Sequence, residues 1–170
     1  APNGYDPTGA NCVNPCNIDS SAITVAVTNL STSSTPVVVT IPTTSFDCSI
    51  IPGIVNYQIT STDLGYTIAD GVYKFVYTII DSSDNNRIYN RVCYLVSDCN
   101  VCCTLEQKLK DLKSCGTCND KNNKEIDKLY EIYMLRAKAH HLAACHDFTG
   151  AKEVLDYIIN ALDLKTCDNC

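Results

Sequence analysis

Residues 70–77, with the sequence Asp-Gly-Val-Tyr-Lys-Phe-Val-Tyr, decide the fold class of the first half of this 170-residue chain. An Asp-Gly turn signal is followed by Tyr, Phe and Tyr at every second position, the period of side chains on one face of a β-strand. Similar segments rich in Val, Ile, Thr and Tyr lie on both sides, separated by Ser, Thr, Asp, Asn, Gly and Pro. The predicted strands are Ala22–Asn29, Pro36–Pro42, Ile54–Thr60, Val72–Ile80 and Ile88–Ser97.

Short strands at this spacing are typical of an antiparallel β-sandwich. Within residues 70–77, Tyr73 resembles the tyrosine that begins one strand of immunoglobulin-like and fibronectin-like sandwiches, whose hydroxyl bonds back to the preceding loop. The chain has no tryptophan to serve as its usual core partner. We therefore predict an immunoglobulin-like β domain over residues 18–98. Residues 1–17 carry Pro and Gly but no periodic apolar pattern, so we expect an extended N-terminal arm there.

After residue 98 the apolar residues recur every three or four positions, which predicts three amphipathic helices. Short connections between them favour antiparallel neighbours, so we expect an up-down-up bundle over residues 99–170. The fold class predicted for the whole chain is α+β, as two domains. The apolar stripes of the three helices are Leu105, Leu109 and Leu112; then Ile126, Leu129, Tyr130, Tyr133, Ala137 and Ala144; then Val154, Leu155, Ile158, Ile159 and Leu162.

Twelve cysteines are the most unusual feature of the composition. An up-down-up bundle brings the end of the first helix, the start of the second and the end of the third to one pole. Two Cys-x-x-Cys elements meet there and offer four thiolates for a tetrahedral zinc ion, although disulfides would hold the same pole together. The predicted set is Cys115, Cys118, Cys167 and Cys170.

A second cysteine cluster is expected at the opposite pole, where it fits one disulfide with spare thiols as well as it fits a metal. Its members are Cys99, Cys102, Cys103 and Cys145, with His141 and His146 nearby. The remaining cysteines are Cys12, Cys16, Cys48 and Cys93, whose disulfide connectivity cannot be derived from sequence. Cys48 and Cys93 either cross the sandwich or pair with the two in the arm.

Charge and motifs exclude several functional classes. The net charge is −6 and neither half is basic, so we expect no nucleic-acid partner. No apolar run is long enough to span a membrane. The chain lacks a phosphate-binding Gly-rich loop, a Gly-x-Ser-x-Gly elbow and a His-Glu-x-x-His motif, which predicts a protein that is not an enzyme. A thiol-disulfide oxidoreductase that uses Cys99 and Cys102 is an alternative, but the surrounding βαβ pattern is missing.

The cysteine pattern of the second half carries a resemblance. Cys-x-x-Cys-Cys from Cys99, a helix with Leu129-Tyr130, Asp147-Phe148 and a closing Cys-x-x-Cys follow a β domain that contains an Asp-Gly-x-Tyr strand. This arrangement resembles small virion-associated proteins of tailed bacteriophages, including crAss-like relatives, over most of residues 70–170.

The resemblance implies a structural role in a virion, with other copies of the chain or other virion proteins as partners. It also implies a virion or extracellular location after synthesis in the cytoplasm of a host cell. Zinc is the one cofactor that we expect. An immunoglobulin-like sandwich can also present binding loops, so a secreted adhesion or carbohydrate-binding module is a further alternative.

Overall fold

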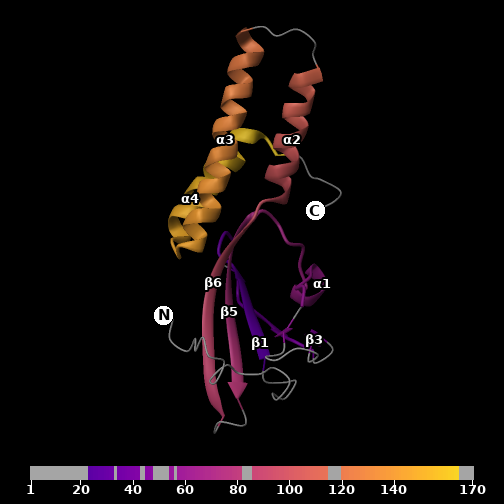
Figure 1. Ribbon diagram of the computed structural model, residues 1–170, viewed down its shortest axis with the longest axis vertical. Helices are drawn as coiled ribbons and strands as arrows, with labels where there is room; N and C mark the ends of the chain where they lie inside the picture. The colour runs from indigo at the N-terminus through magenta and orange to yellow at the C-terminus, as the bar shows by residue number, and fades with distance from the viewer. Residues whose placement is uncertain are drawn as a thin grey trace. The chain divides into compact units, whose positions relative to one another are not determined.

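The computed structural model of the chain has an α+β fold, with a four-stranded antiparallel sheet and helices (Figure 1). It describes residues 23–32, 34–42, 45–47, 54–55, 57–81, 86–114 and 120–164. The predicted arm at residues 1–17 lies outside these ranges. The coarse fold class that the sequence predicts, α+β with an antiparallel sheet, is therefore confirmed.

The main sheet is open, with strand order β2-β1-β5-β6. Its strands are β1 (Ile23–Asn29), β2 (Val37–Thr40), β5 (Gly71–Asp81) and β6 (Arg87–Ser97). Four of the five predicted strands match these elements to within two residues at each end. A separate two-stranded sheet pairs β3 (Phe46–Asp47) with β4 (Ile54–Val55).

The strand predicted over residues 54–60 is wrong for residues 57–60, which lie outside the strands and lead into a short helix, α1 (Ser61–Leu64). Thr60 caps this helix. The Asp63 carboxylate accepts a hydrogen bond from the Thr60 backbone N–H at 2.7 Å, while the Thr60 hydroxyl accepts one from the Asp63 backbone N–H at 3.4 Å. This reciprocal capping box fixes the start of the helix, while Thr60 itself keeps an extended backbone with φ −112° and ψ 168°.

The described residues divide into two compact units, one within residues 1–27, 36–67 and 75–92, the other within 28–35, 68–74 and 93–170. Strands β1, β5 and β6 each continue from one unit into the other. The predicted segments 18–98 and 99–170 therefore do not coincide with these units, and their independence as domains stays a prediction.

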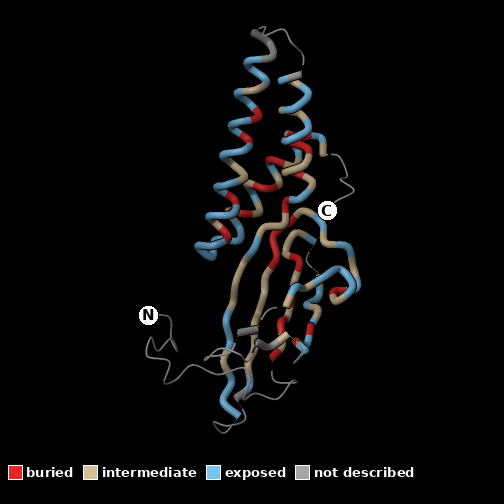
Figure 2. Tube along the Cα trace, turned by 45° about the vertical axis from the view of Figure 1, so that its right-hand side comes forward, coloured by how far each residue is buried: buried red, intermediate tan, exposed pale blue. Residues whose placement is uncertain are grey.

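The first unit is built around the inner face of β1. Buried and half-buried residues alternate along this strand, as expected when one face of a sheet is covered (Figure 2). Residues Ile23, Val25 and Val27 are each at most 5% exposed. Antiparallel pairing sets Val25 opposite Val39 of β2, so the buried faces of the two strands coincide.

The second unit contains the three long helices, which are α2 (Cys99–Ser114), α3 (Asp120–Ala144) and α4 (Phe148–Leu162). All three predicted helices are thus present. They share one hydrophobic cluster, to which Val72 of β5 also contributes: Val72, Val101, Leu105, Leu129, Ile132, Ala143, Ala151, Leu155, Ile158 and Leu162. At the start of α4 the Asp147 carboxylate accepts a hydrogen bond from the Gly150 N–H at 2.9 Å and so caps the helix.

Candidate interaction surface

One side of α3 exposes large apolar side chains. Tyr130 is 51% exposed, Tyr133 47% and Met134 69%. The predicted apolar stripe of this helix joins Tyr130, Tyr133, Ala137 and Ala144 to Leu129, which is 4% exposed. That prediction is wrong for the two tyrosines and the two alanines, which are exposed, because the core side of α3 continues through Ile132 instead, which is 3% exposed.

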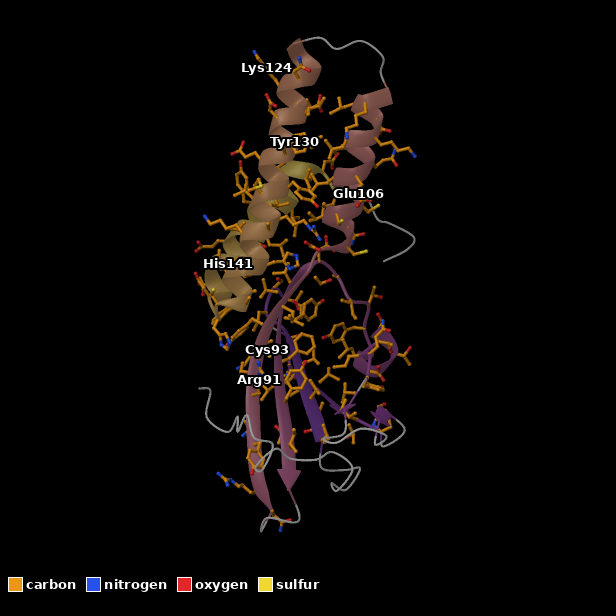
Figure 3. All side chains as sticks on the ribbon, in the orientation of Figure 1. Arg91, Cys93, Glu106, Lys124, Tyr130 and His141 are labelled. Carbon is orange, nitrogen blue, oxygen red and sulfur yellow. The ribbon has the colours of Figure 1, made fainter. Side chains whose placement is uncertain are left out.

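The exposed side has the residue spacing of a coiled coil. Five exposed residues follow one another at intervals of four, three, four and three, which keeps their side chains on one face of the helix over two heptads. We name this face the α3 seam; its residues are Tyr130, Met134, Ala137, His141 and Ala144. Ile132 and Ala139 on the opposite side are buried. Figure 3 labels Tyr130 and His141, one near each end of the seam.

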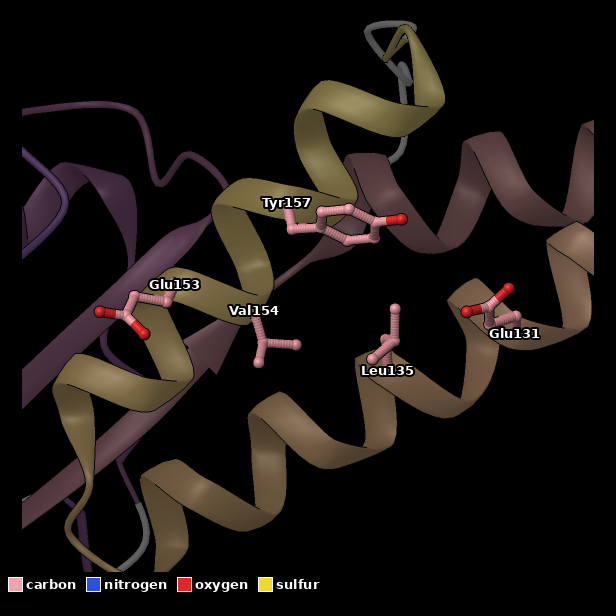
Figure 4. Close-up of a pocket in the computed structure, with 5 residues that line it drawn as sticks. All are labelled: Glu131, Leu135, Glu153, Val154 and Tyr157. Atoms are coloured by element: carbon pink, nitrogen blue, oxygen red, sulfur yellow. The ribbon is translucent and has the colours of Figure 1, made fainter.

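An open hollow of about 370 Å³ lies beside the seam, between α3 and α4 (Figure 4). It is lined by Glu131, Leu135, Glu153, Val154 and Tyr157. Leu135 and Val154 supply apolar walls, and two carboxylates stand among the lining residues. This combination suits a side chain with an apolar stem and a positive charge, such as Lys or Arg.

A charged cluster in the second unit fixes the start of α2 against α3. Asp98, only 8% exposed, immediately precedes α2 and pairs with two residues of α3. Arg136 donates from Nε to Oδ2 at 2.5 Å and from Nη2 to Oδ1 at 3.1 Å, while Nε2 of His140 lies 2.7 Å from Oδ2. A planar guanidinium that holds both oxygens sets distance and orientation together.

The protonation of Asp98 reflects two opposing effects. Burial favours the neutral acid, but hydrogen bonds from Arg136 and His140 and their charges outweigh it, so the pKa of Asp98 lies below its ordinary value. The same hydrogen bond raises the pKa of Arg136. Sequence reasoning missed this cluster, since an Asp just before a helix is the ordinary signal for an N-cap.

Asp70 supplies the cap that the Asp98 side chain does not. Its carboxylate accepts hydrogen bonds from the backbone N–H of Asn100 at 3.0 Å and of Val101 at 2.8 Å, and from Nδ2 of Asn100 at 3.2 Å. These backbone groups belong to the first turn of α2 and have no partner within the helix. The Asp-Gly turn that the sequence analysis singled out thus anchors a helix thirty residues further along the chain.

The predicted hydrogen bond from the Tyr73 hydroxyl back to the preceding loop is confirmed. The Tyr73 hydroxyl donates to the Ala69 carbonyl at 3.0 Å and accepts from the Ala69 N–H at 3.2 Å. Asn29, which is 5% exposed, also donates to it from Nδ2 at 3.2 Å. Tyr73 therefore ties the end of β1 to the turn before β5.

The cysteines of the predicted second cluster are in two chemical states. Cys99 and Cys103 each take part in a disulfide bond, whereas Cys102 and Cys145 carry free thiols. Cys93, which lies on β6 outside this cluster, also carries a free thiol. Among the residues that the structure describes, no group of three or more His, Cys, Asp and Glu side chains could hold a metal ion.

The two cysteines of the first Cys-x-x-Cys element are not joined to each other, because Cys102 is free while Cys99 is bonded. Burial raises the pKa of the Cys102 thiol, and the nearby carboxylate of Glu106 raises it further against the opposing charge of Arg136. An attacking thiol in exchange chemistry needs a lowered pKa, so this environment does not favour the oxidoreductase alternative.

The predicted zinc or disulfide set Cys115, Cys118, Cys167 and Cys170 lies outside the described residues, as do Cys12, Cys16 and Cys48. Their roles stay predictions. In the described part of the chain, no helix has the length and apolar character to cross a membrane.

Comparison with known proteins adds no relative. No protein-family model matches the chain, and neither the curated proteins nor the solved structures contain a match.

Proposed function

We propose that the chain is a non-enzymatic structural protein that associates with other copies of itself through the α3 seam. The observation that carries the proposal is the heptad spacing of the seam, with Met134 69% and Tyr130 51% exposed. Side chains at such positions insert between those of a facing helix. The second copy is the favoured partner because one face can serve as both halves of a two-fold interface.

The energetics favour association of two identical faces. Burying a large apolar side chain such as Met134 contributes about 2 kcal/mol. In a two-fold interface each such residue is buried twice, once from each copy. Glu131 and Lys138 occupy the same flanking position of successive heptads and carry opposite charges. Charges at that position set which partner and which orientation are accepted.

The resemblance to virion-associated proteins of tailed bacteriophages extends the proposal to a virion or extracellular location, with other virion proteins as further partners. The finer fold assignment is part of the same proposal, namely an immunoglobulin-like sandwich followed by a three-helix up-down-up bundle. The corner at Tyr73 supports the first element, and the hydrophobic cluster shared by α2, α3 and α4 supports the second. A zinc site formed by Cys115, Cys118, Cys167 and Cys170 is also part of the proposal.

Substitution of Met134 tests the seam. Size-exclusion chromatography with light scattering gives the molar mass of the native chain and of Met134→Lys. We expect the native chain to elute as a dimer or larger. Loss of about 2 kcal/mol from each copy weakens the dissociation constant roughly a thousandfold in Met134→Lys, which then elutes as a monomer.

Leu95→Lys is the matched control, since Leu95 is an exposed apolar residue too, at 51% against 69% for Met134, but lies on β6. It introduces the same charge in place of an exposed apolar side chain, and it should leave the mass of the native assembly unchanged. Equal masses for the native chain and Met134→Lys would contradict the proposal. So would dissociation by both variants alike, because the effect would then not be specific to α3.

A further inference from the structure

His141 and Cys145 form a pair of metal-ligating groups at the end of α3. They are one helical turn apart, and Nε2 of His141 lies 3.7 Å from Sγ of Cys145. Both side chains are exposed, and Cys145 carries a free thiol. Neither residue belongs to the charged cluster around Asp98, which uses the adjacent His140 instead.

The separation of these two atoms matches two ligands of one zinc ion. Zinc lies about 2.3 Å from a thiolate sulfur and about 2.05 Å from an imidazole nitrogen, so tetrahedral geometry places the two ligand atoms roughly 3.6 Å apart. The observed 3.7 Å differs from this by only a tenth of an ångström. The separation of the two atoms is therefore compatible with both of them binding one ion.

We propose that His141 and Cys145 are one half of a zinc site that a second copy of the chain completes. Two ligands leave half of a tetrahedral coordination sphere open, and no third His, Cys, Asp or Glu joins them among the described residues. A two-fold axis through the ion adds the same two ligands from the other copy. The resulting set of two sulfurs and two nitrogens is one that zinc adopts in closed structural sites.

The position of the pair on α3 identifies the second copy as the partner. His141 belongs to the α3 seam, and Cys145 follows it by one turn on the same side of the helix. Two copies that meet along the seam with their α3 helices parallel, about a two-fold axis that runs along the helices, bring their two pairs together at one end of the interface. The inference rests on the proposed function in this one respect, that copies associate through α3.

Zinc binding at this site releases protons. Each Cys145 thiol gives up its proton to solvent as its sulfur bonds to zinc, while each neutral His141 imidazole donates a nitrogen lone pair. Zinc has no redox role in this step. Without metal, the same 3.7 Å contact is a weak hydrogen bond between thiol and imidazole, so a metal titration separates the two states.

Cobalt provides the optical probe. The full chain, treated with EDTA and dialysed, is titrated with Co²⁺, which gives a thiolate charge-transfer band and strong visible bands in a tetrahedral site. The comparison is between the native chain and Cys145→Ser, His141→Ala and Cys93→Ser. We expect the native chain to bind one more Co²⁺ per two chains than Cys145→Ser or His141→Ala binds. Cys93→Ser is the control, because it removes a free thiol elsewhere in the chain, and it should give the full native signal.

Sedimentation of the same samples in Zn²⁺ and in EDTA provides the second readout. We expect zinc to tighten association of the native chain but not of Cys145→Ser. Identical titrations of the native chain and Cys145→Ser would overturn the site, as would one additional metal per chain with no change in association. Association in EDTA tests the α3 seam separately, so failure of the metal site and failure of the proposed function are distinguishable.

Discussion

Asp98→Asn is the substitution whose consequence follows most directly from the structure. The change removes one negative charge with almost no change in shape. It leaves the guanidinium of Arg136, whose side chain is 24% exposed, facing a neutral amide in place of a carboxylate that is 9% exposed. It also weakens the link between the start of α2 and the middle of α3.

The expected cost is about 2 kcal/mol of unfolding free energy. Breaking a fully buried ion pair costs roughly 3–5 kcal/mol, and an exposed pair contributes below about 1 kcal/mol. The pair of Asp98 and Arg136 lies between these limits, because Arg136 keeps partial solvent contact. The control is Asp156→Asn, where a carboxylate 46% exposed lies 2.6 Å from Lys152, and we expect less than about 0.5 kcal/mol there.

Urea unfolding followed by circular dichroism at 222 nm measures both changes, and the pH dependence identifies their origin. Since the folded-state pKa of Asp98 lies below its ordinary value of 3.8, its stabilisation is present in full above that value and is lost as the pH falls through the folded pKa. The difference between the native chain and Asp98→Asn should therefore be constant near neutral pH and shrink below about pH 4. Equal costs for Asp98→Asn and Asp156→Asn at neutral pH would refute this account of Asp98.

Two further predictions concern the anchors on either side of β5. Tyr73→Phe removes the hydroxyl that bonds to Ala69 and leaves the buried amide of Asn29 without that acceptor, so we expect a loss of about 1–3 kcal/mol in urea unfolding; Tyr157→Phe, on a residue 58% exposed, should change stability little. Asp70→Ala leaves the N–H groups of Asn100 and Val101 without their acceptor and should cost about 1–2 kcal/mol, with Asp70→Asn costing less; no loss in Asp70→Ala would contradict the assignment of the cap.

The strands and the corner were predictable because their signals are local. Alternation along Ile23–Asn29 gives the buried face of β1 directly. The Asp-Gly-Val-Tyr sequence places Tyr73 just after a tight turn, within reach of Ala69, whose carbonyl accepts its hydrogen bond. The strand predicted through Thr60 shows the limit of such signals. A β-like composition does not say whether a neighbouring strand is present to pair with the segment, and residues 57–60 lie outside the described strands.

The exposed apolar side of α3 was not predictable, for a different reason. Apolar residues lie on two sides of α3, and a periodic pattern cannot say which side faces the core. Packing against α4 and α2 selects the side of Leu129 and Ile132, and this choice leaves Tyr130 and Met134 exposed. The exposed stripe thus consists of apolar residues of α3 that do not pack into the chain's own core.

Sequence reasoning also could not show that Asp70 caps α2 while Asp98 binds Arg136. Both residues are acids next to turn or helix boundaries, and local rules assign Asp98 as the cap of α2. Only the fold brings Arg136 to Asp98 and the first turn of α2 to Asp70. The states of the cysteines are equally non-local, since Cys99 and Cys103 are bonded while Cys102 between them is free.

Association through α3 is the central claim, and sedimentation equilibrium of the native chain in EDTA over a range of concentrations tests it most directly. We expect a mass that rises with concentration from that of one 18.6 kDa chain to at least twice that value. The same measurement on Met134→Lys should give the mass of a single chain throughout. A native chain that stays monomeric at every concentration would contradict the account.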